Sequence, residues 1–138
     1  MAANVRRQWM ALCDFDRLMP HAQLEILLVR FNELARLETL AMPTRGFMVL
    51  PEWIGALCSL RRVMLHDNQL KALPESFGRL VHLKTLYLGH NQLTTLPETL
   101  GVLVALEDFD LDHNHLDTLP QSFGQLVALE TLWLQRNL

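Results

Sequence analysis

Three aspartates alternate with apolar residues along one short segment of the chain: Asp108, Asp110 and Asp112. In a β-strand every second side chain projects from the same face, so this spacing would place the three carboxylates side by side. Like charges so close repel one another unless a cation or a basic partner offsets them. We therefore expect the segment to attract a partner that carries lysine or arginine. The equally open alternative is a solvated acidic strand that Arg62 or Arg136 partly neutralises.

Three large side chains, Met64, Tyr87 and Trp133, occupy equivalent places at multiples of 23 residues, and Asp110 interrupts the series. Exposed tryptophan and tyrosine are among the residue types most enriched at binding hot spots. On one shared face these side chains would form an amphipathic stripe suited to a protein or peptide partner. The alternative is that they only pack on one another, as neighbours across a sheet do.

Four histidines, His66, His90, His113 and His115, fall close to Asp67 and to the three aspartates. Imidazole and carboxylate together could bind zinc, but side chains on a shallow sheet surface make no closed cage. The run from Asp110 to His115 mimics the opening of a calcium loop, yet histidine stands at the sixth position, where such a loop needs glycine. The sequence therefore predicts no metal site and no cofactor.

A catalytic role finds no support in the residue pattern. No serine lies in a nucleophile-elbow motif, and there is no glycine-rich phosphate-binding loop. Cys58 directly follows the core residue Leu57, which predicts a small buried or half-buried side chain rather than a nucleophile. We therefore expect that the chain is not an enzyme.

An internal repeat defines the elements that would position these residues. Leucine makes up 31 of the 138 residues, which prompts a search for a period. Leu-Pro pairs begin every 23 residues, at Leu50, Leu73, Leu96 and Leu119. Counted from each pair as offset zero, glycine recurs at offset 5, leucine at 7, 10 and 15, and an apolar residue at 13. Asparagine recurs at offset 18, as Asn68, Asn91, Asn114 and Asn137.

The apolar residues at offsets 13 and 15 alternate, as in a strand with one buried face. One short strand cannot bury that face alone, so successive coils must stack their strands in parallel over a shared core. Proline at offset 1 favours the start of a short helix on the opposite side, and the glycine at offset 5 would serve as a turn residue. The asparagine lies where the chain leaves the strand, and its amide can bond turn backbone that would otherwise be buried and unpaired.

The pattern L-x-x-L-x-x-L-x-L-x-x-N-x-L-x-x-L-P resembles the leucine-rich repeat family over residues 50–138. The 23-residue form with Leu-Pro is similar to the typical intracellular class of plant Ras-group and bacterial proteins. The resemblance implies an α/β solenoid, a right-handed curved stack with a parallel sheet on its concave side. It also implies a module that binds a protein or peptide there.

Residues at offsets 12, 14, 16 and 17 would point outward from the concave strands, and they are chemically diverse where the core is uniform leucine. We predict that these columns form the partner-binding surface. Its candidate residues are Arg62, Met64, His66, Tyr87, His90, Asp108, Asp110, Asp112, His113, Trp133, Gln135 and Arg136.

Residues 1–33 fall outside the register. Apolar residues there recur at helical spacing, which predicts two amphipathic helices. A solenoid exposes an apolar end unless it is capped, so we assign these helices to an N-terminal cap. The alternative is a separate helical hairpin that itself binds a partner. Residues 34–49 fit a degenerate first repeat, with Arg45 in place of the asparagine.

At the other end, the repeat that starts at Leu119 stops at Leu138, before its offset-20 leucine and without a polar cap. The last strand would then keep an unpaired edge over an open core. We expect either a longer chain or another molecule over this end, with self-association as the testable case.

Composition excludes several of the remaining classes of protein. A formal net charge of −3 is too small, and of the wrong sign, for a nucleic-acid partner. No apolar run could span a membrane, the first residues lack a signal-peptide core, and two cysteines make no disulfide framework. A cytoplasmic protein-interaction module is the first prediction. The alternative is a targeting or regulatory domain of a larger enzyme whose catalytic part is absent from this chain.

Overall fold

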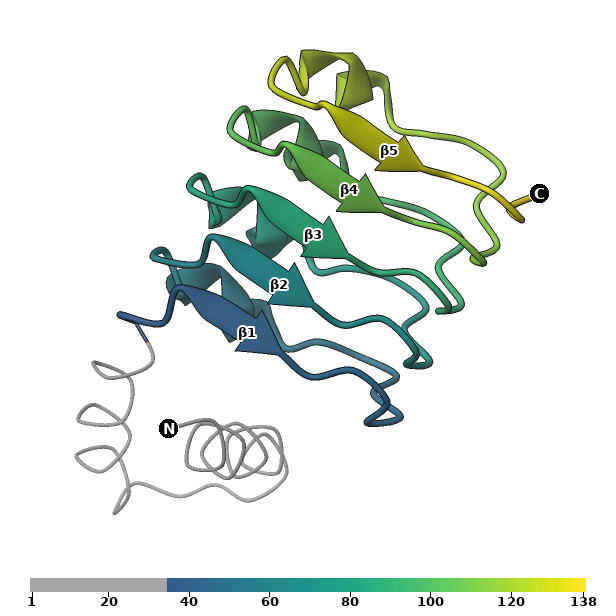
Figure 1. The fold of residues 1–138 in the computed structure, drawn as a ribbon, viewed down its shortest axis with the longest axis horizontal. Helices are drawn as coiled ribbons and strands as arrows, with labels where there is room; N and C mark the ends of the chain where they lie inside the picture. Colours follow the sequence, from purple (N-terminus) through teal and green to yellow (C-terminus); the bar gives the residue numbers. More distant parts are fainter. Residues whose placement is uncertain (1–34) are drawn as a thin grey trace.

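The computed structural model describes residues 35–138, which form a stack of coils around one core (Figure 1). Each coil contributes one three-residue strand, and the strands pair in parallel in sequence order to form an open five-stranded sheet. The strands are β1 Thr39–Ala41, β2 Arg62–Met64, β3 Thr85–Tyr87, β4 Asp108–Asp110 and β5 Thr131–Trp133. The predicted solenoid with a parallel sheet is confirmed, whereas the predicted cap over residues 1–33 lies outside the described residues.

A short 3-10 helix precedes each of the strands β2 to β5 and lies on the other side of the coil (Figure 1). The helices are η2 Glu52–Ala56, η3 Glu75–Arg79, η4 Glu98–Val102 and η5 Gln121–Gln125. Each begins directly after the proline of a Leu-Pro pair, for example Pro51 with φ −73° and Pro120 with φ −62°. Proline locks φ near this value, so it sets the entry into each helix.

The central residue of each strand points into the core. Leu40, Val63, Leu86 and Phe109 are almost completely buried, and the last three lie on strands that have a neighbouring coil on both sides. Leu132, the central residue of the edge strand β5, is 37% exposed. The alternation along each strand therefore leaves the flanking residues on the opposite, open side of the sheet.

The offset-18 asparagines form a ladder under the turns that follow the strands. The Oδ1 atom of Asn91 accepts the N–H of Leu70 at 3.0 Å, and its Nδ2 donates to the carbonyls of Leu65 (3.0 Å) and Leu88 (2.9 Å). The same contacts to turn backbone recur in the other coils at Asn68, Asn114 and Asn137. The prediction that this amide bonds turn backbone is confirmed.

The residue before each of these turns has left-handed backbone. Its φ is between 53° and 57° at Thr44, Asp67, His90, His113 and Arg136. None of the five is glycine, so the conformation carries a steric cost. Hydrogen bonds between coils offset that cost: the N–H of His90, for example, donates to the carbonyl of Asp112 at 2.8 Å.

Glycine at offset 5 is needed because the 3-10 helices of adjacent coils approach closely. A Cβ on Gly78 would lie 2.6 Å from both the Cβ and the carbonyl oxygen of Thr99. Gly55 and Gly101 are crowded in the same way, whereas no atom of the described residues lies within 4 Å of a Cβ on Gly124, in the last described coil. Our interpretation of these glycines as turn residues was therefore wrong about the physical reason.

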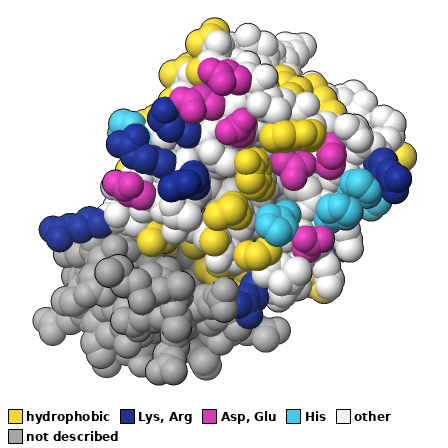
Figure 2. Space-filling model, in the orientation of Figure 1, with side chains coloured by type: hydrophobic (Ala, Val, Ile, Leu, Met, Phe, Trp, Pro, Cys, Tyr) yellow, Lys and Arg dark blue, Asp and Glu magenta, His cyan; other side chains and the backbone are white. Residues whose placement is uncertain are grey.

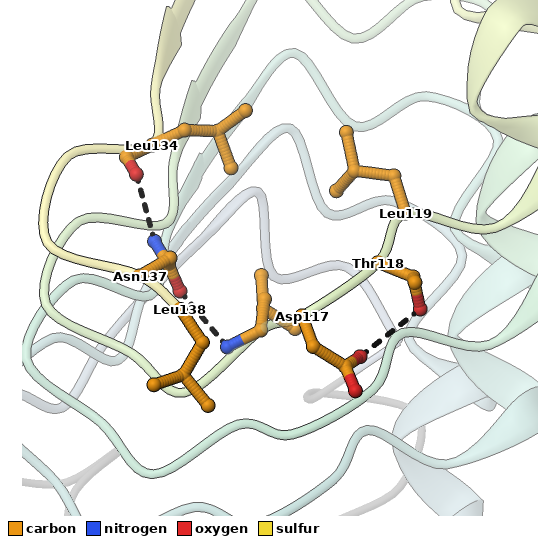
Figure 3. A pocket seen from close by; sticks show the side chains of 7 residues that line it. Asp117, Thr118, Leu119, Leu134, Asn137 and Leu138 are labelled. Carbon is orange, nitrogen blue, oxygen red and sulfur yellow. Dashed lines mark hydrogen bonds between the residues drawn. The ribbon is translucent and has the colours of Figure 1, made fainter.

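Beyond β5 the core is open. A hollow of about 220 Å³ lies there, and Figure 3 shows the side chains of Leu134 and Leu119 pointing toward each other across it. Leu138, at its rim, is 87% exposed. The Nδ2 of Asn137 donates to the carbonyl of Leu134 at 2.9 Å and closes the last turn. The described chain therefore ends in an uncovered apolar face beside an unpaired strand edge.

Candidate functional site

The open face of the sheet, formed by the outward residues at offsets 12, 14, 16 and 17, carries all twelve predicted partner-binding residues. None of the twelve is buried. Figure 2 shows this side of the molecule: apolar side chains run along the middle of the sheet, acidic side chains lie on both sides of them, and histidines gather beyond the ends of the strands. The sequence pattern therefore brings residues together that are far apart in the chain.

One row of side chains crosses the middle of the open face. The sheet register sets Met64, Tyr87, Asp110 and Trp133 opposite one another on the adjacent strands β2 to β5. The rings of Tyr87 and Trp133 come together across the intervening strand, with centroids 6.2 Å apart and an angle of 81° between the planes. Asp110 thus interrupts the aromatic stripe in sequence but not in space. Both rings remain half-buried, with part of each surface exposed.

The three aspartates lie on and just beyond β4, and backbone N–H groups orient two of them. The Oδ1 atom of Asp110 accepts the N–H of Asp112 at 2.9 Å. In turn, the Oδ1 atom of Asp112 accepts the N–H of Gln135 at 2.7 Å. These two carboxylates are therefore fixed in direction, while Asp108 lies at the start of the same strand.

No basic group of the described residues neutralises these aspartates. The ion pairs within residues 35–138 join Lys84 to Glu107 at 2.5 Å and His66 to Asp67 at 2.8 Å. Neither pair includes an aspartate of the open-face triplet. Neither Arg62 nor Arg136 therefore forms an ion pair with the triplet in the described structure.

The histidines form two separate arrangements. The rings of His90 and His113 stack with centroids 4.0 Å apart and 17° between the planes. The Nδ1 atom of His113 is buried and has no hydrogen-bond partner. His66 is instead paired with Asp67. Within residues 35–138, no group of histidine, cysteine, aspartate and glutamate is arranged so that it could hold a metal ion.

The remaining predicted residues lie at the margins of the open face. Arg62 is exposed on β2, in one row with Thr85 and Asp108. Gln135 and Arg136 are exposed just after β5. These three side chains can reach a large partner, but they do not touch the central row.

Sequence reasoning missed a column of exposed apolar residues at offset 8. Val81, Val104 and Val127 are 44%, 52% and 81% exposed, on the ridge between each 3-10 helix and the next strand. Cys58 occupies the same column and is exposed, so the expectation of a buried or half-buried thiol was wrong. The preceding leucine turns inward, which leaves the next side chain in solvent. The recurrence of small apolar residues at this offset was the signal that could have revealed the column.

Residues 58–116 match the leucine rich repeat family. These coils are leucine-rich repeats. The match spans the strands β2 to β4 together with Asn68, Asn91 and Asn114, and the fold extends the same geometry to β1 and β5.

The chain is similar to several solved structures. A leucine-rich repeat protein of Leptospira interrogans is 36% identical over 78% of this chain and 28% of the other, with a TM-score of 0.76. The structure of PEPR1–AtPEP1 is 28% identical over 73% of this chain and 15% of the other, with a TM-score of 0.68. An internalin from Listeria monocytogenes is 25% identical over 78% of this chain and 31% of the other, with a TM-score of 0.67.

This chain therefore spans less than a third of the length of each of these proteins. A search of curated protein sequences returned no match. In the described range, residues 35–138, no helix is long and apolar enough to cross a membrane.

Proposed function

We propose that this chain binds a protein or peptide on the open face of its sheet. The observation that carries the proposal is the central row, in which Tyr87 and Trp133 hold partly exposed rings against each other on a rigid platform. Aromatic side chains supply large contact area at low entropic cost, and they dominate binding hot spots when a partner covers them. The unpaired aspartates beside them favour a basic partner and speed its encounter.

The comparisons support an interaction role of this kind. Leucine-rich repeats build extended binding surfaces from stacked coils, and the similar structures include an internalin and PEPR1 together with AtPEP1. The proposed role is non-catalytic: in the described residues, the open face presents aromatic, acidic and imidazole groups without a nucleophile held by a base.

A selection from a library of random short peptides displayed on phage tests this function. Peptides selected on the unaltered protein should bind it measurably and lose at least about tenfold in affinity to a Tyr87→Ala/Trp133→Ala variant, because each ring is a hot-spot candidate worth more than about 1.4 kcal/mol. The matched control is Val81→Ala/Val104→Ala, which removes two exposed apolar side chains from the ridge and should bind as the unaltered protein does. Undiminished binding by the aromatic double variant would contradict the proposal.

We also propose that two copies associate through the uncovered end beside β5. At this end, the groups that pack between coils elsewhere have no neighbouring coil among the described residues. Leu132 is 37% exposed, and Gly124 has free space where the earlier glycines contact a neighbouring coil. A two-fold axis through this end would pair the two β5 edges antiparallel and cover both apolar faces.

Sedimentation velocity at rising protein concentration tests the association. The mass should increase toward that of a dimer, and Leu132→Lys should keep the protein monomeric because it places a charge in the paired surface. Val104→Lys is the control, since Val104 is also exposed, at 52% against 37% for Leu132, but lies on the ridge of an earlier coil. A monomer at every concentration would refute the association and leave the open-face proposal untouched.

We place this activity in the cytoplasm, as the composition predicted. The exposed free thiol of Cys58 supports a reducing compartment, because such thiols oxidise readily outside one. Fractionation of cells that express the protein tests this location.

A further inference from the structure

We propose that Tyr87, Asp110 and Trp133 form a subsite for one cationic side chain of the partner, an arginine guanidinium in preference to a lysine ammonium. The inference rests on the proposed function and names the chemistry that the centre of the open face selects. It follows from one oriented carboxylate on β4, the strand between the two strands that carry the aromatic rings.

The sheet register creates this arrangement. Tyr87 on β3 lies opposite Asp110 on β4, which in turn lies opposite Trp133 on β5. Neighbouring strands are about 4.8 Å apart, so residues on β3 and β5 start about twice that distance from each other. Their ring centroids are nevertheless only 6.2 Å apart, which means that the rings lean toward each other over the strand that carries the carboxylate. The 81° between the ring planes presents one face and one edge rather than a closed stack.

The carboxylate of Asp110 is held in place before any partner arrives. Its Oδ1 accepts the N–H of Asp112, and its Oδ2 lies 2.6 Å from the point that a Cβ on Gly89 would occupy. The absence of a side chain at Gly89 therefore makes the room into which the Asp110 carboxylate leans. Within the described residues the Oδ2 atom accepts no hydrogen bond, so it remains free to accept one from a ligand. Such prior orientation lowers the entropic cost of binding.

Within residues 35–138, no basic side chain of the protein pairs with Asp110 in the subsite. In the described part of the chain, Lys84 pairs with Glu107 and no basic nitrogen pairs with Asp110. Asp108 lies on β4 and Asp112 lies just beyond it. Their charges add to the negative potential around Asp110. An external cation is the group that would relieve this repulsion.

Guanidinium fits these groups better than ammonium. It is planar, so it can lie against an aromatic face while its N–H groups point in the plane toward a carboxylate oxygen. Ammonium is a compact and strongly hydrated charge, which loses more hydration in such a site. A neutral side chain of the same shape would keep the stacking and lose the charge-assisted hydrogen bond.

Three capped tripeptides test the subsite: acetyl-Gly-Arg-Gly-amide, its lysine analogue, and its citrulline analogue, which is a neutral copy of arginine. Each is titrated into ¹⁵N-labelled full-length protein, and the indole N–H signal of Trp133 is followed. We expect the arginine peptide to shift this signal in a saturable way, the lysine peptide to bind more weakly, and the citrulline peptide to bind at least about tenfold more weakly than arginine.

The informative variant is Asp110→Asn, which keeps an oxygen for the N–H of Asp112 and removes the charge. It should weaken the arginine peptide at least about tenfold. Asp117→Asn is the control, because Asp117 is an exposed aspartate just before the Leu119-Pro120 pair and its Oδ1 accepts the hydroxyl of Thr118; it should leave binding unchanged. The inference is overturned if the arginine peptide leaves the Trp133 signal unmoved, if citrulline binds as well as arginine, or if Asp110→Asn binds as the unaltered protein does.

Failure of this subsite would be distinguishable from failure of the proposed function. Library peptides that lose binding to the Tyr87→Ala/Trp133→Ala variant but bind Asp110→Asn normally would leave the open face as the binding surface and remove the cation subsite from it. Library peptides that bind both variants as well as they bind the unaltered protein would contradict the proposed function itself.

Discussion

Replacing Asn91 with alanine should destabilise the fold far more than its small volume suggests. Asn91 is 5% exposed, and its side chain makes three hydrogen bonds of 3.0 Å or less to backbone. Without it the N–H of Leu70 loses its acceptor and stays buried. The carbonyls of Leu65 and Leu88 each keep a second amide partner, from Asn68 and Asn114 respectively.

These contacts set the size of the effect. One buried N–H left unpaired costs about 1–3 kcal/mol, and each of the two shared carbonyl bonds contributes less, toward the lower end of about 0.5–1.5 kcal/mol. We therefore expect Asn91→Ala to lower the free energy of unfolding by about 2–4 kcal/mol. With a urea m-value of about 2 kcal/mol/M, the unfolding midpoint should fall by roughly 1–2 M.

The matched control is Gln92→Ala, one residue along. Gln92 is half-buried and its backbone N–H donates to the carbonyl of Leu70 at 2.9 Å, a bond that alanine retains. Urea melts followed by circular dichroism should give nearly the same midpoint for Gln92→Ala as for the unaltered protein. Equal midpoints for the Asn91→Ala and Gln92→Ala variants would refute the argument that the asparagine ladder supports the turns.

Three further changes probe the stacking of coils and the charge of the open face. Gly78→Ala should destabilise by about 2 kcal/mol or more, because its Cβ collides with the Thr99 backbone, whereas Gly124→Ala should be neutral or slightly stabilising; thermal melts that rank them otherwise would contradict the close-approach explanation. The hydrogen bond from the Ser122 backbone N–H lowers the pKa of Glu98, so the carboxylate stabilises the fold above its unfolded pKa and this contribution is lost as the pH falls through the lower folded value. Glu98→Gln should therefore be less stable than the unaltered protein in urea melts at neutral pH, with a gap that closes in acid; a gap that is constant with pH would count against this. Replacing all three open-face aspartates with asparagine should lower the association rate of a selected basic peptide in stopped-flow mixing and reduce the salt dependence of that rate. Association rates equal to those of the unaltered protein at both low and high salt would show that the triplet does not contribute to binding.

Much of the fold could be predicted because each feature repeats with the 23-residue period. The strands, the Leu-Pro helix starts and the asparagine contacts each depend on a local pattern and on a neighbour with the same pattern. Features that depend on the distance between coils were not predictable in this way. The role of Gly78 is an example, since it is set by the approach of Thr99 on the next helix rather than by the backbone of the glycine itself.

The candidate site, like the fold, could be predicted from the repeat pattern only in part. Alternation along the strands predicted which residues face outward, and none of the twelve candidate residues is buried. Side-chain conformations decided the rest: the rings of Tyr87 and Trp133 bridge a strand, and the Asp110 carboxylate leans into the space over Gly89. The exposed Cys58 was missed because its neighbour Leu57 belongs to the core, and the pattern alone does not show where the chain turns on the ridge.

Amide chemical-shift mapping of a selected peptide on the ¹⁵N-labelled protein tests the central claim most directly. If the open face is the binding surface, the largest changes will fall on the strands β2 to β5 and on the residues just after them, with Tyr87, Asp110 and Trp133 at the centre. Changes concentrated instead on the helices η2 to η5, or along the ridge of Val81, Val104 and Val127, would contradict it.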